Sequence, residues 1–313
     1  MVAETQQDAR DGDILVFGRS GQLARALRRS LAARRAPHRA VGREGCDLTH
    51  APEGCSKLIA GARAVINASG YTAVDAAETH GPANRALNAT APGSLATLCA
   101  RAGVPFVHVS TDYVFAGDAQ TPYRPDSPTA PLNAYGRAKL AGERAVRAAR
   151  GNSLILRTSW VYDGTGRNFL TTMLRIGREH GTVRVVDDQI GRPTYAGHLA
   201  EAVLCALDRG WTGTRLHHVQ NTGAPVSWAG FARAIFQGAG MDAGVTPIPT
   251  ADYPTPAARP AYSVLDVAGF EGAFAHPLED WRTGLALALA ERGLAERGLA
   301  ERSLAERDVA ERN

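Results

Sequence analysis

Short apolar runs alternate along the chain with longer segments in which apolar residues recur every three or four positions. The first run, Ile14–Gly18, is followed by a segment in which Leu23, Leu27 and Leu31 are spaced four residues apart. The run predicts a buried strand, and the leucine spacing predicts a helix with one apolar face.

The same alternation continues through the first half of the chain. Three further apolar runs predict strands, at Ala64–Asn67, Pro105–Thr111 and Ser153–Tyr162. Helical spacing is found in Arg85–Arg101, which Pro92 interrupts, and in Ala134–Arg150. Such an exchange of strands and helices is typical of a parallel sheet with helices on both faces. We therefore expect an α/β fold of the Rossmann type, built on a doubly wound parallel sheet.

The pattern becomes less regular after Tyr162. Helices are still predicted near Phe169–His180 and Ala196–Asp208, and strands at the segments VRVV and RLHHV. The stretch TPIPTADYPTPAARPAY is expected to be largely irregular, because proline lacks a backbone donor. We predict one domain at residues 13–160, to which later segments return. A smaller, interleaved C-terminal domain is predicted mainly at residues 161–288.

Residues 289–313 repeat a pattern of the LAERG type every five positions. On a helix, five residues turn the apolar position by about 140°, so that no single face collects the leucines. We interpret this tail as a frayed helix or a disordered extension without a catalytic role.

Composition excludes several classes of protein. The 313 residues are 44% hydrophobic and 21% charged, with a formal net charge of +4. No dense basic run is present, so nucleic acid is not an expected partner. The polar N-terminal segment does not resemble a signal or transit peptide, and no apolar run approaches the roughly 20 residues that span a bilayer. A cytoplasmic protein without membrane contact is expected.

Four cysteines, Cys46, Cys55, Cys99 and Cys205, lie apart in the chain and show no C-x-x-C spacing. A zinc site or a framework of disulfides is therefore not expected. We predict reduced thiols, as in ordinary cytoplasmic proteins.

The first predicted strand runs directly into the sequence GRSGQLA. Gly18 and Gly21 permit a tight turn and a close approach of the backbone to a pyrophosphate, and Ala24 permits close packing of helix on strand. The N-terminus of the following helix offers free N–H groups to phosphate oxygens. Glycine turns also join strands to helices where no ligand binds. The position after the first strand is what favours a dinucleotide site here.

Residues near the end of the second predicted strand bear on the choice of dinucleotide. Enzymes that use NAD usually place an acidic residue there to hold the ribose hydroxyls. Here Arg43 lies near that position, and Arg19 lies in the phosphate loop itself. Two guanidinium groups suit a 2′-phosphate and favour NADPH. Glu44 adjoins Arg43, however, and leaves NADH as the alternative.

The sequence YGRAK places Tyr135 and Lys139 four residues apart, and thus on the same face of a helix. The lysine is notable because the chain has two lysines, Lys57 and Lys139, against 33 arginines. An ammonium close to a phenol favours the phenolate and makes tyrosine a usable acid–base group. Taken alone, the pair could equally be a partly buried tyrosine beside a solvated lysine.

Other motifs change this weighting. They include GRSGQLA, INASGYTAVDAAE, STDYVFAG, RTSWVY, NFLTTML and DDQIGRPT. Together with YGRAK, they make residues 13–285 resemble the extended short-chain dehydrogenase/reductases, and among these the dTDP-4-dehydrorhamnose reductase family. The resemblance implies an NADP-binding Rossmann domain and a substrate-binding second domain. It also implies reduction of the C4 keto group of a dTDP-4-keto-6-deoxy-hexose.

Three residues acquire catalytic roles from this resemblance. Tyr135 would protonate the C4 carbonyl oxygen, while Lys139 would bind the nicotinamide ribose and lower the pKa of Tyr135. Thr111 would hydrogen-bond the carbonyl region in the usual place of a serine. Ser110 is the rival, and since adjacent strand residues point to opposite faces, only one of the two is expected to contribute.

Binding residues are implied in the same way. At the cofactor we expect Gly18, Arg19, Gly21, Gln22, Leu23, Arg43, Asp47, Leu48, Gly70, Tyr71, Thr72, Tyr135 and Lys139, of which Asp47 and Leu48 would lie beside the adenine. At the substrate we expect Thr111, Asp112, Trp160 and Arg259. Trp160 could equally be a core aromatic. Arg259, which would pair with a substrate phosphate, could equally be a surface arginine.

Two positions depart from the family pattern. Some members bind a divalent cation through an acidic residue of the first helix, where this chain has Ala26. We therefore expect no Mg²⁺ and no metal-bridged dimer, which leaves a homodimer of another kind open. Tyr262 replaces an asparagine that is common in the family and could alter substrate contacts or only packing.

The leading hypothesis is conversion of dTDP-4-dehydro-L-rhamnose to dTDP-L-rhamnose with NADPH. A related deoxysugar 4-ketoreductase of natural-product biosynthesis is the nearest alternative, because pocket loops decide the sugar. A non-catalytic NADP-binding regulatory subunit belongs to another class, and the intact set of Thr111, Tyr135 and Lys139 argues against it. A sugar-nucleotide epimerase or dehydratase on the same scaffold is a further alternative, and the dehydratase is disfavoured because Tyr113, and not glutamate, follows Asp112.

Overall fold

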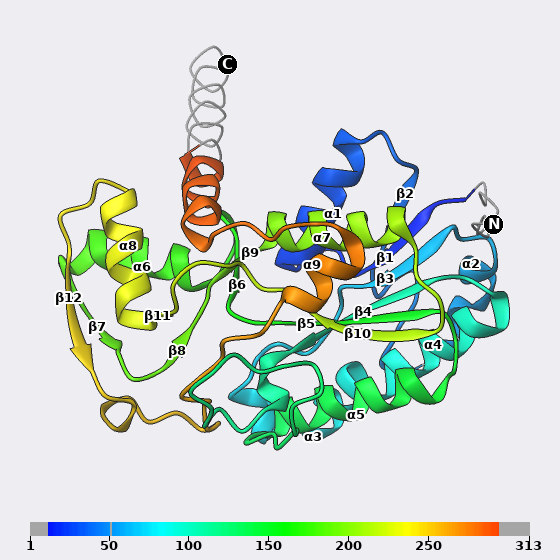
Figure 1. The fold of residues 1–313 in the computed structure, drawn as a ribbon, viewed down its shortest axis with the longest axis horizontal. Coiled ribbons are helices and arrows are strands. Elements are labelled where there is room, and N and C mark those ends of the chain that lie inside the picture. Colours follow the sequence, from blue (N-terminus) through cyan, green and yellow to red (C-terminus); the bar gives the residue numbers. More distant parts are fainter. Residues whose placement is uncertain (1–11, 51, 294–313) are drawn as a thin grey trace, which may run out of the picture.

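A six-stranded parallel sheet forms the centre of the molecule, in the order β10-β5-β4-β3-β1-β2 (Figure 1). The computed structural model describes residues 12–50 and 52–293. The sheet strands are β1 (Ile14–Phe17), β2 (His38–Val41), β3 (Ala64–Asn67), β4 (Phe106–Thr111), β5 (Ser153–Thr158) and β10 (Thr214–His218). The expectation of a Rossmann-type parallel sheet is confirmed.

Helices pack on both faces of this sheet. On one face lie α1 (Gln22–Ala33), α7 (Ala196–Arg209) and α9 (Ala268–Phe274). On the other lie α2 (Ser56–Ala60), α4 (Ala91–Ala102) and α5 (Ala134–Ala148), with the short α3 (Gly81–Arg85) beside α5. α7 and β10 come from the second half of the chain and nevertheless belong to this sheet and its helix layer.

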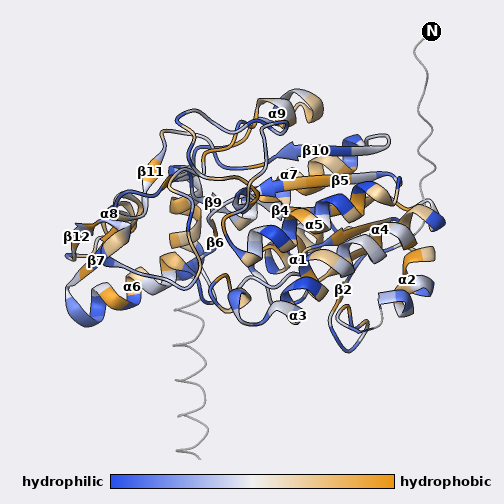
Figure 2. Cartoon of the chain, turned by 90° about the horizontal axis from the view of Figure 1, so that it is seen from below, coloured by the Kyte–Doolittle hydropathy of each residue, from blue (hydrophilic) through white to orange (hydrophobic). Residues whose placement is uncertain are grey.

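The four residues of β1 serve two hydrophobic cores at once. Ile14 and Val16 belong to the cluster under α1 and α7, whereas Leu15 and Phe17 belong to the cluster under α2 and α4. Successive side chains of a strand point to opposite faces, so a strand buried on both faces is apolar throughout. Figure 2 shows the hydrophobic interior strands, in contrast to the more hydrophilic edge strand β10.

A second lobe lies beyond one end of the sheet (Figure 1). It contains α6 (Phe169–His180) and α8 (Trp228–Gly238), which pack on the paired strands β7 (Thr182–Val186) and β12 (Gly244–Ile248). Two small pairs connect it to the sheet, namely β6 (Val161–Tyr162) with β9 (Thr194–Tyr195) and β8 (Ile190–Gly191) with β11 (Val226–Ser227). A helix over residues 281–293 contributes Trp281 and Leu285 to the same core. No helix in the described part of the chain is long and apolar enough to cross a membrane.

Three predicted segments differ in detail. The strand predicted at Ser153–Tyr162 is divided into β5 and β6, because Trp160 adopts a left-handed φ of 48° that breaks the extended backbone. The proline-rich stretch is mostly irregular, but β12 extends into it as far as Ile248. Pro247 is accommodated because β12 pairs on one side alone among the described strands. Of the predicted tail, residues 289–293 are helical, and 294–313 lie outside the described residues.

The helix predicted at Arg85–Arg101 is interrupted before Pro92 and not at it. A π-helical turn at Ala86–Thr90 separates α3 from α4, and Pro92 lies in the first turn of α4, where its missing N–H costs no helical hydrogen bond. Single π turns inside helices are often found at functional sites.

The prediction of four reduced thiols is wrong for two cysteines. Cys46 and Cys55 form a disulfide with their Cα atoms 5.8 Å apart, while Cys99 and Cys205 are free. The chain between the two cysteines folds back so that they lie close together. Their spacing in the sequence does not reveal this proximity. Burial raises the pKa of the Cys99 thiol to about 12 and so keeps it protonated.

The contact of α5 with the π turn provides a test of the packing. A Cβ placed on Gly142 would lie 2.2 Å from the carbonyl oxygen of Asn88. Gly142→Ala should therefore lower the free energy of unfolding by about 2 kcal/mol, although alanine is the better helix former.

Urea denaturation would measure this loss, with Gly272→Ala of α9 as the matched control. No atom lies within 4 Å of a Cβ at Gly272. The control should be neutral or stabilising by up to about 1 kcal/mol. Equal urea midpoints for the two variants would contradict the tight contact.

Candidate active site

The candidate site lies at the carboxyl ends of the central strands, where β1 turns into α1 and β4 ends at Thr111. The strand order reverses between β1 and β3, and ligands of such folds bind at this reversal. Gly18 has a φ of +117°, and a Cβ there would lie 3.2 Å from the carbonyl oxygen of Ala68. The turn at Gly18 therefore has a backbone conformation that favours glycine, and it leads into the N-terminus of α1. This geometry fits a dinucleotide pyrophosphate.

Residues of the first turn of α1 have two different tasks. The Gln22 side chain donates to the carbonyl oxygen of Val161 at 3.1 Å, and so ties the phosphate loop to β6. The Leu23 side chain is buried in the core under α1 and α7. Gly21 is the N-cap of the helix. Gln22 and Leu23 are thus at the predicted site, with their side chains committed to the protein.

Arg19 and Glu44 form an exposed ion pair between the phosphate loop and the turn after β2. The pKa of Glu44 is lowered, first by its own backbone N–H and then by Arg19. Arg43 is exposed beside them. The Arg19 side chain therefore reaches from the phosphate loop to the turn after β2, where Arg43 lies beside Glu44, the carboxylate that leaves NADH as an alternative.

The predicted adenine residues follow in the next loop. Asp47 accepts hydrogen bonds from the backbone and side chain of Thr49, and these bonds lower the pKa of Asp47 to about 2. Leu48 is buried against the core under α2 and α4. Gly70, Tyr71 and Thr72 form the loop that leaves β3, on the other side of β1.

The candidate catalytic residues Thr111 and Tyr135 are brought together by β4 and α5. α5 begins at Ala134, because the Asn133 side chain accepts from the backbone N–H of Gly136 at 2.8 Å. Burial raises the pKa of Tyr135 to about 12, and a hydrogen bond with the Thr111 side chain opposes this shift. The lowered pKa that the resemblance implied for Tyr135 is therefore not found here. Desolvation of the phenolate is the dominant effect.

Lys139 is buried one helical turn after Tyr135. Its ammonium donates to the carbonyl oxygen of Val109 on β4 at 2.5 Å. Burial lowers the pKa of Lys139 to about 8, and the charge of Glu143 opposes this shift. The alternative of a solvated lysine is thus wrong.

The two neighbouring hydroxyls of β4 point to different partners. Ser110 donates to Glu143 at 2.6 Å, whereas Thr111 donates to Asp112 at 3.0 Å and contacts Tyr135. The structure therefore favours Thr111 as the hydroxyl of the site. Asp112 is buried, which raises its pKa to about 6 against the lowering effect of hydrogen bonds with Ser263 and Thr111.

Sequence reasoning missed Asn88, a buried asparagine in the π turn. Its side chain accepts from the Tyr71 backbone N–H at 3.1 Å and donates to the Tyr71 carbonyl oxygen at 2.9 Å. It also donates to Asn84, whose amide donates to the carbonyl oxygen of Ala134. This chain of amides connects the predicted cofactor loop to the first residue of α5. The available signal was a pair of asparagines, Asn84 and Asn88, four residues apart and thus on one face of a helical segment.

The predicted substrate residues Trp160 and Arg259 have protein partners. Trp160 stacks on Trp228 of α8 with ring centroids 3.5 Å apart, and remains partly exposed. Arg259 forms two hydrogen bonds with Asp75, of 3.0 and 2.8 Å, and so joins the segment before Tyr262 to the loop after β3. Neither a purely core tryptophan nor a free surface arginine describes these positions.

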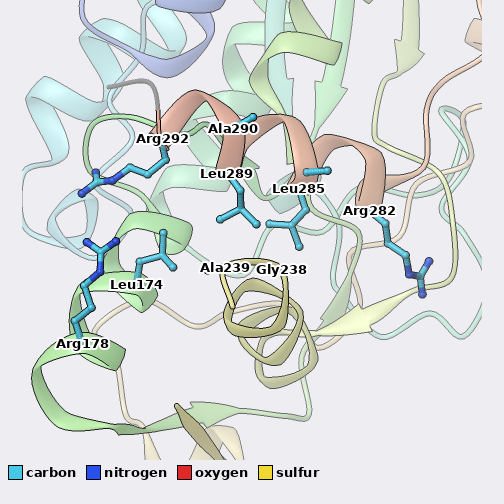
Figure 3. A pocket seen from close by; sticks show the side chains of 11 residues that line it. Leu174, Arg178, Gly238, Ala239, Arg282, Leu285, Leu289, Ala290 and Arg292 are labelled. Carbon is cyan, nitrogen blue, oxygen red and sulfur yellow. The ribbon is translucent and has the colours of Figure 1, made fainter. Parts of the chain in front are cut away.

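A cavity of about 540 Å³ lies elsewhere in the molecule (Figure 3). It is lined by α6, the end of α8 and the helix of residues 281–293, from which Leu285 and Leu289 point toward Gly238. None of the predicted site residues lines it. Within residues 12–50 and 52–293, no group of three or more metal-ligating side chains could hold a cation. Ala26, at the position of the family's acidic residue, is buried in the core of α1.

The model of the RmlD substrate binding domain matches residues 12–293. The chain belongs to this family. The resemblance to the dTDP-4-dehydrorhamnose reductase family, drawn from the motifs, is confirmed.

Relatives match along nearly their whole length. The dTDP-4-dehydrorhamnose reductase of Mycobacterium tuberculosis is 43% identical over 283 residues, covering 88% of this chain and 92% of the relative. A probable dTDP-4,6-dihydroxy-2-methyloxan-3-one 4-ketoreductase of Streptomyces antibioticus is 41% identical over 281 residues, covering 88% and 94%. A crystal structure of the Bacillus anthracis dTDP-4-dehydrorhamnose reductase with NADP is 32% identical, with a TM-score of 0.84, and covers 90% and 99%.

The buried carboxyl of Asp112 predicts a pH-dependent stability. Its pKa is raised from 3.8 to about 6 in the folded protein, so folding favours the protonated form. The cost of the buried carboxylate is absent below pH 3.8, grows between the two pKa values and is complete above about pH 6. Asp112→Asn should therefore raise the free energy of unfolding by about 3 kcal/mol at pH 8 and have little effect near pH 4.

Urea denaturation at the two pH values measures this difference. Asp242→Asn removes an exposed carboxyl and serves as the control, with no expected gain at either pH. A gain for Asp112→Asn of the same size at pH 4 and pH 8 would show that the carboxylate charge is not the cause.

Proposed function

We propose that the protein reduces the C4 keto group of a dTDP-4-keto-6-deoxy-hexose with NADPH, and that dTDP-4-dehydro-L-rhamnose is the substrate. The chain is an oxidoreductase of the dTDP-4-dehydrorhamnose reductase type, as its relatives are. The observation that carries the finer proposal is the contact of Thr111 with Tyr135 at the end of β4, beside a glycine loop that fits a dinucleotide.

Thr111, Tyr135 and Lys139 have separate roles in the proposed reaction. Thr111 holds the C4 carbonyl oxygen of the substrate, and Tyr135 gives its phenolic proton to that oxygen. The high pKa of Tyr135 keeps the phenol protonated at neutral pH, which is the form needed for reduction. When bound, the nicotinamide cofactor supplies the hydride. Lys139 provides a positive charge one helical turn away.

The second candidate is a 4-ketoreductase of natural-product biosynthesis with a different sugar or C4 configuration. The Streptomyces antibioticus relative favours it, because its 41% identity is close to that of the rhamnose-pathway relatives. Both candidates use the same acid, hydroxyl and cofactor loop, so that substrate contacts in the second lobe would separate them.

Purified protein with NADPH and dTDP-4-dehydro-L-rhamnose should oxidise the cofactor, followed as loss of its absorbance. Tyr135→Phe should reduce kcat by about 10²- to 10⁴-fold, because the proton donor is lost, while NADPH affinity stays within a few-fold of wild type. Tyr253→Phe, at an exposed tyrosine, is the control.

Two outcomes would overturn the proposal. Absence of turnover with every dTDP-4-keto-6-deoxy sugar tried, despite tight NADPH binding, would favour the regulatory subunit. Full activity of Tyr135→Phe would exclude the phenol as the acid.

Arg43 provides a test of cofactor choice. If its guanidinium binds the 2′-phosphate, Arg43→Ala should weaken NADPH binding by about tenfold or more and leave NADH binding nearly unchanged. Fluorescence titration with both cofactors measures this, with Arg215→Ala on the exposed edge of β10 as the control. An equal loss for NADPH and NADH would mean that Arg43 does not recognise the 2′-phosphate.

A further inference from the structure

Glu143 is a buried carboxylate at the centre of a polar cluster formed by three elements. It lies on α5 and is 1% exposed. Ser110 of β4 donates to its Oε1 at 2.6 Å. Arg157 of β5 donates through Nε to Oε1 at 2.9 Å and through Nη2 to Oε2 at 2.7 Å. The carboxylate therefore joins α5 to the two strands that carry the catalytic end of the sheet.

The helix places Glu143 in line with the catalytic pair. Tyr135, Lys139 and Glu143 are each four residues apart on α5, so they form one row along its surface. Lys139 is the middle member, and its ammonium also reaches the Val109 carbonyl oxygen, next to Ser110. The same strand segment thus holds both the lysine and the glutamate.

Among the described residues, the Glu143 carboxylate is the charge that favours the ammonium form of Lys139. Among the groups from neighbouring elements, His108 of β4 is buried, and its pKa lies well below the ordinary value, first because of burial and then because of the Lys139 charge. It is therefore neutral. Arg157 of β5 binds both oxygens of the Glu143 carboxylate. Burial lowers the pKa of Lys139, and the Glu143 charge opposes it.

We propose that Glu143 is a positioning residue for the reaction, whose carboxylate keeps Lys139 an ammonium and fixes the row of α5 against β4. Arg157 and Ser110 hold the carboxylate in place. The role in catalysis rests on the proposed function, in which Lys139 supplies a positive charge one helical turn from Tyr135. Ser110, the alternative to Thr111, thereby has a separate role, which is to hold the Glu143 carboxylate on the opposite face of β4.

A purely structural role does not account for this arrangement equally well. Replacing a buried ion pair by apolar residues of similar volume is often neutral or stabilising, so stability gives little reason to keep the pair. A charge requirement at Lys139 does give such a reason. The two roles differ in one observable, the protonation of Lys139.

The scarcity of lysine makes that protonation directly measurable. Protein labelled with ¹³C-lysine carries two labelled side chains, Lys57 and Lys139, and Lys57→Arg assigns them. In NMR titrations, Glu143→Gln should lower the midpoint of Lys139 by about one pH unit or more, because the negative charge one helical turn away is lost. The exposed Lys57 should not change. An unchanged Lys139 midpoint would overturn the proposal.

Matched variants separate charge from burial and folding. Asp163→Asn removes another buried carboxylate that is paired with an arginine, Arg25 at 2.7 Å, and should leave the Lys139 midpoint as in wild type. Glu143→Asp keeps the negative charge, so the titration midpoint of Lys139 should return most of the way to its wild-type value. If Glu143→Gln does not fold, Glu143→Gln with Arg157→Met removes both charges, and the midpoint of Lys139 should again fall. No fall in this double variant would overturn the proposal.

The pH dependence of kcat/KM provides a second measurement, which depends on catalysis as well as on the charge of Lys139. The alkaline limb of kcat/KM should move to lower pH in Glu143→Gln by the same shift as the Lys139 midpoint, and Glu143→Asp should reverse this. If the wild-type protein turns over no dTDP-4-keto sugar, the proposed function fails, while the NMR titration still decides whether Glu143 holds the lysine charge. An NMR shift without a matching shift of the limb would refute the catalytic role of Glu143.

Discussion

The packing of α5 on β4 is the contact on which the site depends. Thr111 comes from the strand, while Tyr135 and Lys139 come from the helix, so neither element carries the whole candidate site. The Asn133 cap determines where the helix begins, and the Val109 carbonyl oxygen receives the Lys139 ammonium. The distance between helix and π turn is set by Gly142, at which a side chain would collide with backbone. A small shift of the helix would therefore separate the acid from the hydroxyl.

Burial is the second constraint on the chemistry. Water exclusion raises the pKa of Tyr135 and of Asp112 and lowers the pKa of Lys139, so each group is pushed toward its neutral form. A neutral phenol suits a proton donor, whereas a neutral lysine would lose its electrostatic effect. Charge at the lysine thus needs support from within the protein. The row of α5 contains one candidate for this support, the glutamate one turn further along.

Tertiary contacts also explain where sequence reasoning was incomplete. The glycine loop, YGRAK and the strand ending in Thr111 were recognised from local patterns, since each is a short continuous motif. Asn88 was not, because its partners Tyr71 and Asn84 become neighbours only through the π turn. The Cys46–Cys55 disulfide was missed for the same reason, since a turn and a loop separate the two residues. Arg259 was thought to be free for a phosphate, and its partner Asp75 lies 184 positions away in the chain.

The sequence by itself determined the parallel sheet and its helix layers, because strand periodicity, helix periodicity and glycine turns act over a few residues. It also predicted Tyr135 and Lys139 as an acid–base pair, through the YGRAK motif and the family resemblance. Only the tertiary structure decided which hydroxyl of β4 faces the phenol, which way the pKa of Tyr135 moves, and that a glutamate shares the row of the lysine. These depend on desolvation and on contacts between elements distant in the chain. Burial changes the protonation of these groups, and composition does not reveal which groups are buried.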